Sequence, residues 1–164
     1  MLLWLSTTSA ESEGVPEVFF YQLQTRSLEA ALPPLLEKSL ERGWRVVVQT
    51  DSAERIEALD GHLWTYRDDS FLPHGVANAR DAADQPILLT SGPDNANSAN
   101  VRFVIHGADL PADIDAYERV VLMFDGTDED AVAAARLRWK DIKEKGFETS
   151  YLQQSPEGRW ERKT

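Results

Sequence analysis

A cationic stripe beside one tryptophan is the part of this sequence best suited to binding a ligand. Five of the seventeen lysines and arginines lie in the ten residues 136–145. On a helix, Arg136, Lys140 and Lys143 fall at positions i, i+4 and i+7, so their side chains share one face. Trp139 lies on the adjoining face, which places an aromatic ring beside the cations. Such a surface can bind an anionic group next to an apolar one.

The charge of the remaining chain makes this stripe stand out. The protein has a net charge of -11, yet residues 136–164 hold eight basic and five acidic residues. The preceding 135 residues hold nine basic and twenty-three acidic residues. An acidic protein with one basic, aromatic region is expected to bind a negative partner there. The same acidity argues against general DNA binding, because an acidic surface repels phosphate.

The periodicity of the stripe allows two interpretations. In the first, Trp139 is a core residue and the cations are a solvated face that offsets acids elsewhere. In the second, Trp139 belongs to an apolar seam that borders a pocket with a cationic rim. The seam runs through Val132, Ala135, Trp139 and Ile142, at successive spacings of three or four residues. The pocket would suit a peptide with a free carboxylate on an apolar last residue and acids before it, because a guanidinium pairs with carboxylate through two hydrogen bonds.

A second aromatic segment runs from Trp64 to His74. It contains the sequence Ser-Phe-Leu-Pro-His at 70–74, in which Phe71 and Leu72 precede Pro73. Trp64 and Phe71 either close the edge of a sheet or form an exposed patch. Aromatic side chains on a backbone fixed by proline are typical anchors of protein interfaces.

The motifs of nucleotide-binding and thiol chemistry are missing from the sequence. There is no cysteine, so disulfides, thiol catalysis and zinc bound by cysteine are excluded. No Gly-x-Gly-x-x-Gly or Gly-x-x-x-x-Gly-Lys-Ser/Thr occurs, and the first predicted strand is followed by a segment without glycine. A phosphate cradle needs such glycines for close backbone approach. The sequence therefore predicts no nucleotide cofactor.

The histidines and acids do not form a recognisable metal or catalytic motif. His62, His74 and His106 are too far apart in sequence to share one turn of a helix, so no metal site is predicted. A hydrolase-type or nucleotide-dependent enzyme that uses acids such as Asp51 or Asp125 at the carboxyl edge of a sheet remains an alternative. Fold class alone motivates it, and fold class is a poor guide to function.

The alternation of strand and helix patterns predicts an α/β protein with a mostly parallel central sheet flanked by helices. Strands are predicted at 18–23, 44–50, 85–90, 102–106, 119–124 and 147–153. Helices are predicted after Ser27, after Asp51 or Ser52, and from 127–130 to Lys145. Pro33 and Pro34 should make the first turn of the first helix irregular. Residues 68–75 should form a turn, and the residues after 153 a short tail.

The length of 164 residues suits one domain, predicted here to span 15–164. Residues 1–14 are polar after a short apolar start, and a disordered extension is expected there. That start lacks a basic region and is too short for a signal peptide. No apolar run approaches a membrane span, so the cytoplasm is the expected location.

Several landmarks, in order, resemble the chi subunit of the bacterial DNA polymerase III holoenzyme. The most specific are the tryptophan followed by Ser-Phe-Leu-Pro-His, and the helix Ala-Arg-Leu-Arg-Trp-Lys that leads to Gly146 and Phe147. The others are Val-Phe-Phe-Tyr-Gln-Leu at 18–23, Gly-Trp-Arg-Val-Val-Val at 43–48, the segment 59–64 and Pro-Ile-Leu-Leu at 86–89. Together they cover roughly residues 17–160.

The resemblance implies a fold similar to nucleotide-binding proteins that binds no nucleotide. It implies a non-catalytic adaptor that links the clamp loader to single-stranded DNA-binding protein by holding the acidic C-terminal tail of that protein. The tail site would comprise Arg136, Trp139, Lys140 and Lys143. Chi proteins commonly have tyrosine where Trp139 stands, so this position departs from the family pattern.

The resemblance also implies a second partner, the psi subunit or a helicase. Its interface would comprise Trp64, Phe71, Leu72 and Pro73. DNA would then be reached only indirectly. The competing hypothesis is direct binding of single-stranded DNA through Arg138, Trp139 and Trp160, since aromatic residues and cations together can stack bases.

Overall fold

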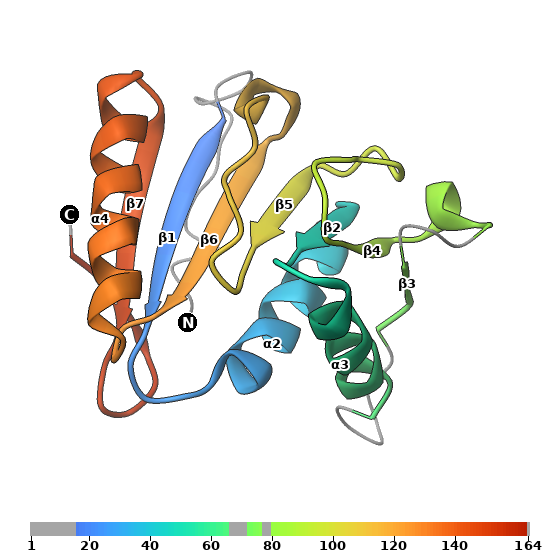
Figure 1. Cartoon of the computed structure of the whole chain (residues 1–164), viewed down its shortest axis with the longest axis horizontal. Helices are drawn as coiled ribbons and strands as arrows, with labels where there is room; N and C mark the ends of the chain where they lie inside the picture. The colour runs from blue at the N-terminus through green and yellow to red at the C-terminus, as the bar shows by residue number, and fades with distance from the viewer. Residues whose placement is uncertain (1–15, 66–71, 77–79, 164) are drawn as a thin grey trace.

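The computed structural model describes residues 16–65, 72–76 and 80–163. The predicted extension at 1–14 and the side chain of Phe71 lie outside these residues. The described chain forms one eight-stranded sheet in the order β3-β4-β2-β5-β6-β1-β7-β8 (Figure 1). All neighbouring strands are parallel except β7 and β8, which are antiparallel. The predicted α/β class with a mostly parallel sheet is confirmed.

The elements follow the predicted alternation closely. The strands are β1 (Glu17–Leu23), β2 (Val46–Gln49), β3 (His74–Val76), β4 (Ile87–Thr90), β5 (Val101–Val104), β6 (Arg119–Asp125), β7 (Glu148–Gln154) and β8 (Trp160–Arg162). The α-helices are α2 (Leu28–Glu41), α3 (Ala53–Trp64) and α4 (Glu129–Glu144). Two single-turn 3₁₀ helices are η2 (Ala82–Asp84) and η3 (Ile114–Ala116). Of these, η3 follows Pro111 and precedes β6.

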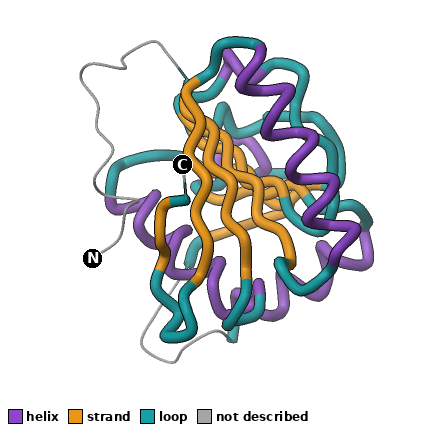
Figure 2. The backbone as a smooth tube through the Cα atoms, turned by 90° about the vertical axis from the view of Figure 1, so that its left-hand side faces the viewer, coloured by secondary structure: helices purple, strands orange, loops and turns teal. Residues whose placement is uncertain are grey.

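The sheet separates two apolar layers, as the alternation of side chains along β1 requires. Phe19 and Tyr21 point into the layer that includes α2 and α3. Val18 and Phe20 point into the other layer, which is covered by α4. Figure 2 shows helices on both sides of the twisted sheet. Of the α-helices in the described ranges, only the one with the cationic stripe, α4, lies on this face.

The prolines of α2 do not interrupt the helix, which corrects the prediction of an irregular first turn. Pro33 cannot donate the backbone hydrogen bond that the carbonyl of Glu29 would accept from residue i+4. The Nε2 atom of His62, on α3, lies 2.7 Å from that carbonyl oxygen and donates to it. A side chain thus supplies the bond that the proline lacks, and α2 is continuous from Leu28 to Glu41.

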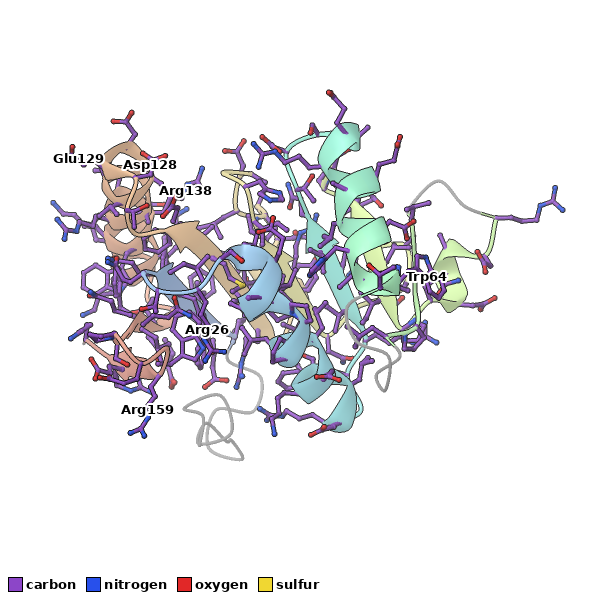
Figure 3. The ribbon with its side chains drawn as sticks, turned by 90° about the horizontal axis from the view of Figure 1, so that it is seen from below. Arg26, Trp64, Asp128, Glu129, Arg138 and Arg159 are labelled. Atoms are coloured by element: carbon purple, nitrogen blue, oxygen red, sulfur yellow. The ribbon has the colours of Figure 1, made fainter. Side chains whose placement is uncertain are left out.

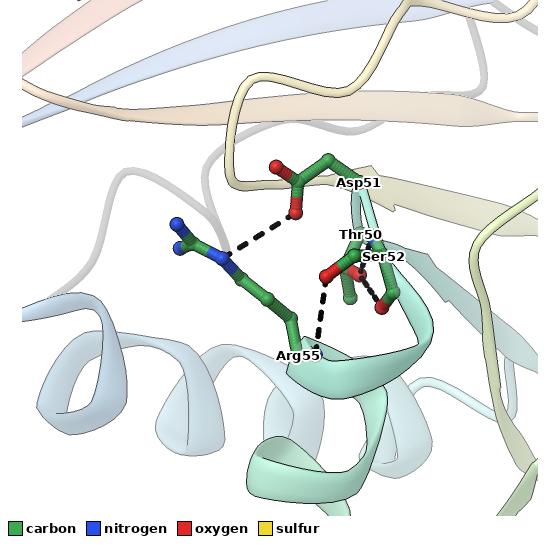
Figure 4. A network of polar contacts seen from close by, with 4 residues as sticks. All are labelled: Thr50, Asp51, Ser52 and Arg55. Atoms are coloured by element: carbon green, nitrogen blue, oxygen red, sulfur yellow. Dashed lines mark hydrogen bonds and ion pairs between the residues drawn. The ribbon is translucent and has the colours of Figure 1, made fainter.

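The start of α3 shows why Ser52 rather than Asp51 is the cap (Figure 4). The Ser52 hydroxyl accepts from the backbone N–H of Arg55 at 3.3 Å. The Thr50 hydroxyl donates to the Ser52 carbonyl at 3.0 Å. Asp51 instead pairs with Arg55 at 3.4 Å, one turn further along.

Two short strands were not predicted. β3 begins at His74, where the proline and glycine indicated only a turn. β8 lies in what was expected to be a tail, and it pairs Leu152 with Arg162 and Gln154 with Trp160. The ring of Trp160 packs edge-on against Tyr21, with centroids 4.7 Å apart. This contact across strands stabilises a segment whose own sequence is too short and charged to mark a strand.

In the described part of the chain, every helix is too short or too polar to cross a membrane.

We predict that His62→Ala lowers the free energy of unfolding by about 1–2 kcal/mol, because it leaves the Glu29 carbonyl without its donor. His62→Gln should restore part of the loss, since its amide can donate. Urea denaturation at constant slope measures both effects. Equal losses in the two variants would show that the bond to Glu29 does not stabilise the fold.

Candidate binding site between α4 and β7

A pocket of about 570 Å³ lies where α4 meets the edge of the sheet. Its lining residues come from β1, α4, β7 and the end of β8. They are Gln22, Arg136, Trp139, Lys140, Tyr151, Gln153 and Lys163. The structure thus brings Arg136, Trp139 and Lys140 together. Lys143 does not line the pocket, but its ammonium lies over the Trp139 ring, 4.7 Å from the centroid.

The ends of α4 are well capped, which fixes the direction of its side chains. Asp128 accepts from the backbone N–H groups of Asp130 and Ala131. At the other end, Gly146 adopts a left-handed conformation with φ of 91°. The helix buries Ala135 and Ile142 against the sheet, so the cationic stripe faces solvent beside the pocket.

The aromatic floor of the pocket joins α4 to β7. The rings of Trp139 and Tyr151 meet edge to face at 85°, with centroids 6.4 Å apart. Tyr151 also stacks on Phe20 and donates a hydrogen bond from its hydroxyl to Gln22 Oε1. Burial raises the pKa of Tyr151, and the charge of Arg136 opposes that rise. The hydroxyl is therefore a neutral donor at pH 7.

The cations of the stripe differ from their neighbours in having no acidic partner. Arg138 pairs with Asp109 at 3.3 Å and Lys145 with Asp141 at 3.1 Å. Among the described residues, no carboxylate lies within ion-pair distance of Arg136 or Lys140. Within the described residues, Arg136 and Lys140 are therefore not paired with acids of their own chain.

Trp139 satisfies parts of both interpretations. It is half-buried and packs against the apolar layer under α4, as a core residue would. It also lines the pocket beside Arg136 and Lys140. Its buried indole N–H has no hydrogen-bond acceptor in the part of the chain that the structure describes. Trp139 is therefore both a packing residue and a wall of the site.

A larger cavity, of about 710 Å³, lies at the carboxyl ends of β1 and β6. In α/β folds a ligand commonly binds at this edge, where the chain leaves adjacent strands toward opposite faces. Here β1 leads to α2 on one face and β6 to α4 on the other. This is the place that the enzyme alternative requires.

The loop after β1 is closed by a side chain of the protein itself. The Oε1 atom of Gln154 accepts from three consecutive backbone N–H groups, those of Gln24, Thr25 and Arg26, at 2.9, 3.0 and 3.0 Å. Gln154 is only 4% exposed. In nucleotide-binding proteins the N–H groups of this loop point at phosphate oxygens. Here a glutamine oxygen takes that position, so the loop offers no phosphate cradle.

The acids considered for catalysis are also engaged. Asp125 accepts from the hydroxyl and the backbone N–H of Thr127, at 2.6 and 2.8 Å, and these bonds lower its pKa. Asp51 pairs with Arg55. No group of three or more metal-ligating side chains occurs within the described ranges. His62 bonds the Glu29 carbonyl, and the ring of His74 is buried beside Asp60 at 2.9 Å.

The residues of the second predicted surface are placed differently from one another. Trp64 is 54% exposed, and its ring lies over His74 with centroids 4.6 Å apart. Leu72 is 2% exposed and belongs to the core, so its side chain supports this surface from beneath. Pro73 is half-buried, and Phe71 lies outside the described residues. Figure 3 shows Trp64 on the opposite side of the molecule from Arg138 on α4.

The residues proposed for stacking single-stranded DNA do not converge. Trp160 packs against Tyr21 in the layer of α2 and α3, whereas Trp139 lies in the layer of α4. Arg138 donates to the Ala108 carbonyl and to Asp109. The geometry gives no shared platform for bases.

Four of the seven residues that line the pocket were not predicted from the sequence, namely Gln22, Tyr151, Gln153 and Lys163. Tyr151 and Gln153 lie on a predicted strand, but only the pairing of β7 with β1 shows that they sit beside Gln22. Lys163 was assigned to a tail. A hairpin prediction for 154–160, based on the turn at Gly158, could have found it.

The fold and the site together define a class of protein. It is an α/β protein with a mostly parallel sheet, in which Gln154 closes the loop after β1 and a cationic pocket lies between α4 and β7. Residues 15–150 match the family described as "DNA polymerase III chi subunit, HolC". The chain belongs to this family, which is named as a subunit of a DNA polymerase.

Two relatives agree with this assignment. The chain is 30% identical over 117 residues to the DNA polymerase III subunit chi of Pseudomonas aeruginosa, covering 69% of this chain and 77% of that protein. It is 34% identical over 80 residues to the probable DNA polymerase III subunit chi of Rickettsia prowazekii. That match covers 49% of this chain and only 48% of the Rickettsia protein.

We predict that Gln154→Ala lowers the free energy of unfolding by about 2–3 kcal/mol, because three backbone donors lose their acceptor. Hydrogen exchange of the Gln24, Thr25 and Arg26 amides should accelerate. Gln154→Glu should protect them, since a carboxylate still accepts. Gln153→Ala, at the next position, is the control. Unchanged exchange at these amides in Gln154→Ala would contradict the role assigned to this side chain.

Proposed function

We propose that this protein is a non-catalytic adaptor that holds the acidic C-terminal tail of single-stranded DNA-binding protein in the pocket between α4 and β7. The observation that carries the proposal is a pair of cations beside an aromatic floor, Arg136 and Lys140, which have no acidic partner among the residues that the structure describes. Membership of the chi family supports it. DNA would be reached only through that partner, and the cytoplasm would be the location.

The chemistry of the pocket matches both features of such a tail, its apolar last side chain and its carboxylates. The last apolar side chain would pack on Trp139 and Tyr151, which meet at the pocket floor. Arg136 would pair with the terminal carboxylate, and Lys140 with the carboxylate or with an acid before it. Lys143, over the Trp139 ring, would extend the positive field along the tail. The net charge of -11 elsewhere would discourage naked DNA from competing.

The surface around Trp64 is proposed for a second partner, on the clamp-loader side. An indole that is 54% exposed and held against His74 is a suitable anchor. Because this surface lies away from α4 (Figure 3), both partners could be held at once. The psi subunit or a helicase is the proposed occupant. A hydrolase or nucleotide enzyme remains the weaker candidate, because Gln154 occupies the loop that phosphate would need.

We predict that Arg136→Gln combined with Lys140→Gln raises the Kd for a labelled tail peptide about 30-fold, which corresponds to about 2 kcal/mol for two charge-assisted contacts. Fluorescence anisotropy measures the Kd. Affinity of the unchanged protein should fall as salt rises, since exposed charges are screened.

The matched control removes two cations outside the pocket, by Lys145→Gln combined with Arg159→Gln. Figure 3 shows Arg159 at the periphery of the molecule. The Kd of this double variant should stay within about twofold of that of the unchanged protein, because only the general electrostatic field changes. A peptide without its last residue tests the apolar slot. Absence of saturable binding of the intact peptide at low salt would rule the proposal out.

We predict that Trp64→Ala weakens binding of the second partner about tenfold or more and leaves the tail-peptide Kd within about twofold. Calorimetry with the purified psi subunit or helicase of the same organism measures the first effect, and anisotropy the second. A loss of tail binding in this variant would show that the two surfaces are not independent. An unchanged affinity for both partners would remove Trp64 from the interface.

A further inference from the structure

The pocket has a cation that does not come from α4. Lys163 lines it together with Arg136 and Lys140, although it follows β8 near the C-terminal end. It reaches the pocket because β8 folds back along β7, and its backbone N–H donates to the Tyr151 carbonyl at 2.8 Å. Tyr151 is the residue whose ring forms the pocket floor. One residue therefore supports both the aromatic floor and the extra cation.

The hairpin that carries Lys163 is held in place by several contacts. The backbone N–H of Ser155 donates to the Arg159 carbonyl at 2.7 Å and closes the turn. The hydroxyl of Thr25 donates to the Ser155 carbonyl at 2.6 Å and ties the turn to the loop after β1. Trp160 packs edge-on against Tyr21. The position of Lys163 is thus set by the fold rather than by a free tail.

The present partner of Lys163 is weakly held. Its ammonium lies 3.6 Å from the Glu161 carboxylate, and the two side chains are 46% and 54% exposed. An ion pair this exposed contributes little to stability, because water screens it. A carboxylate of a bound ligand could therefore replace Glu161 as the partner of Lys163 at small cost.

We propose that the C-terminal hairpin is a second wall of the ligand site, in which Lys163 contacts a carboxylate of the acidic peptide and Glu161 competes for the same ammonium. This proposal rests on the proposed function and deepens it. It predicts that the acids of a bound peptide are contacted from two sides, by the cations of α4 and by Lys163 on the hairpin. Glu161 then lowers affinity, although it lies next to a binding residue.

The test compares two substitutions of opposite sign. Lys163→Gln should raise the Kd of the tail peptide about threefold to fivefold, the range of an exposed charge pair. Glu161→Gln should lower the Kd about twofold to threefold. In the Lys163→Gln background, Glu161→Gln should lose that gain, because the ammonium for which it competes is gone. A peptide with its acids replaced by amides should be insensitive to Lys163→Gln.

The same hairpin supplies matched controls. Arg159→Gln and Glu157→Gln make the same charge changes in its exposed turn, outside the pocket. If Lys163→Gln and Arg159→Gln changed the Kd equally, the effect would be the general field and the proposal would be overturned. In that case the proposed function would still stand, provided that the unchanged protein bound the peptide and the variant with both Arg136→Gln and Lys140→Gln did not. If the unchanged protein bound no peptide, both proposals would fall together.

Discussion

The interaction on which the site depends is the bond of one buried amide oxygen to three backbone N–H groups. Gln154, at the end of β7, receives the donors of the loop after β1, and so fixes that loop against the neighbouring strand. The same loop holds Gln24, whose Oε1 accepts from Gln22 at 2.7 Å, and Gln22 in turn accepts from the Tyr151 hydroxyl. A continuous set of hydrogen bonds therefore runs from the loop after β1 to the floor of the cationic pocket. Gln154 thus pairs the donors of the loop after β1 and is connected through that loop to the pocket floor.

This arrangement separates the protein from enzymes with similar sheets. The edge where nucleotides commonly bind is present as a cavity, but its backbone donors are already paired. The site proposed for the ligand lies instead at the side of the sheet, between α4 and β7. There the ligand would meet cations on a helix face rather than backbone groups in a loop. Such a surface could hold a flexible peptide without enclosing it, as the proposed adaptor role requires.

Local sequence patterns predicted most of the fold and three of the seven residues that line the pocket. The helical spacing of Arg136, Trp139 and Lys140 was enough to place them together, because they lie within about one turn of one helix. Lys163 could not be placed, since its position depends on a strand pairing that its own sequence does not indicate. The continuity of α2 was also missed, because the donor that compensates Pro33 is His62, on another helix. Leu72 shows the same limit, because the sequence assigned it to the second partner's interface, whereas its side chain lies in the core.

Two cations on α4, which have no acidic partner in the described ranges, carry a cost that concerns evolution rather than recognition. Arg136 and Lys140 share one helix face, so without a partner they repel each other and destabilise the empty protein slightly. Replacing either residue with an acid would remove that repulsion and make the fold more stable. Selection for stability alone would thus erase the stripe. A lineage that lost the ligand should therefore lose this charge pattern before it loses the sheet.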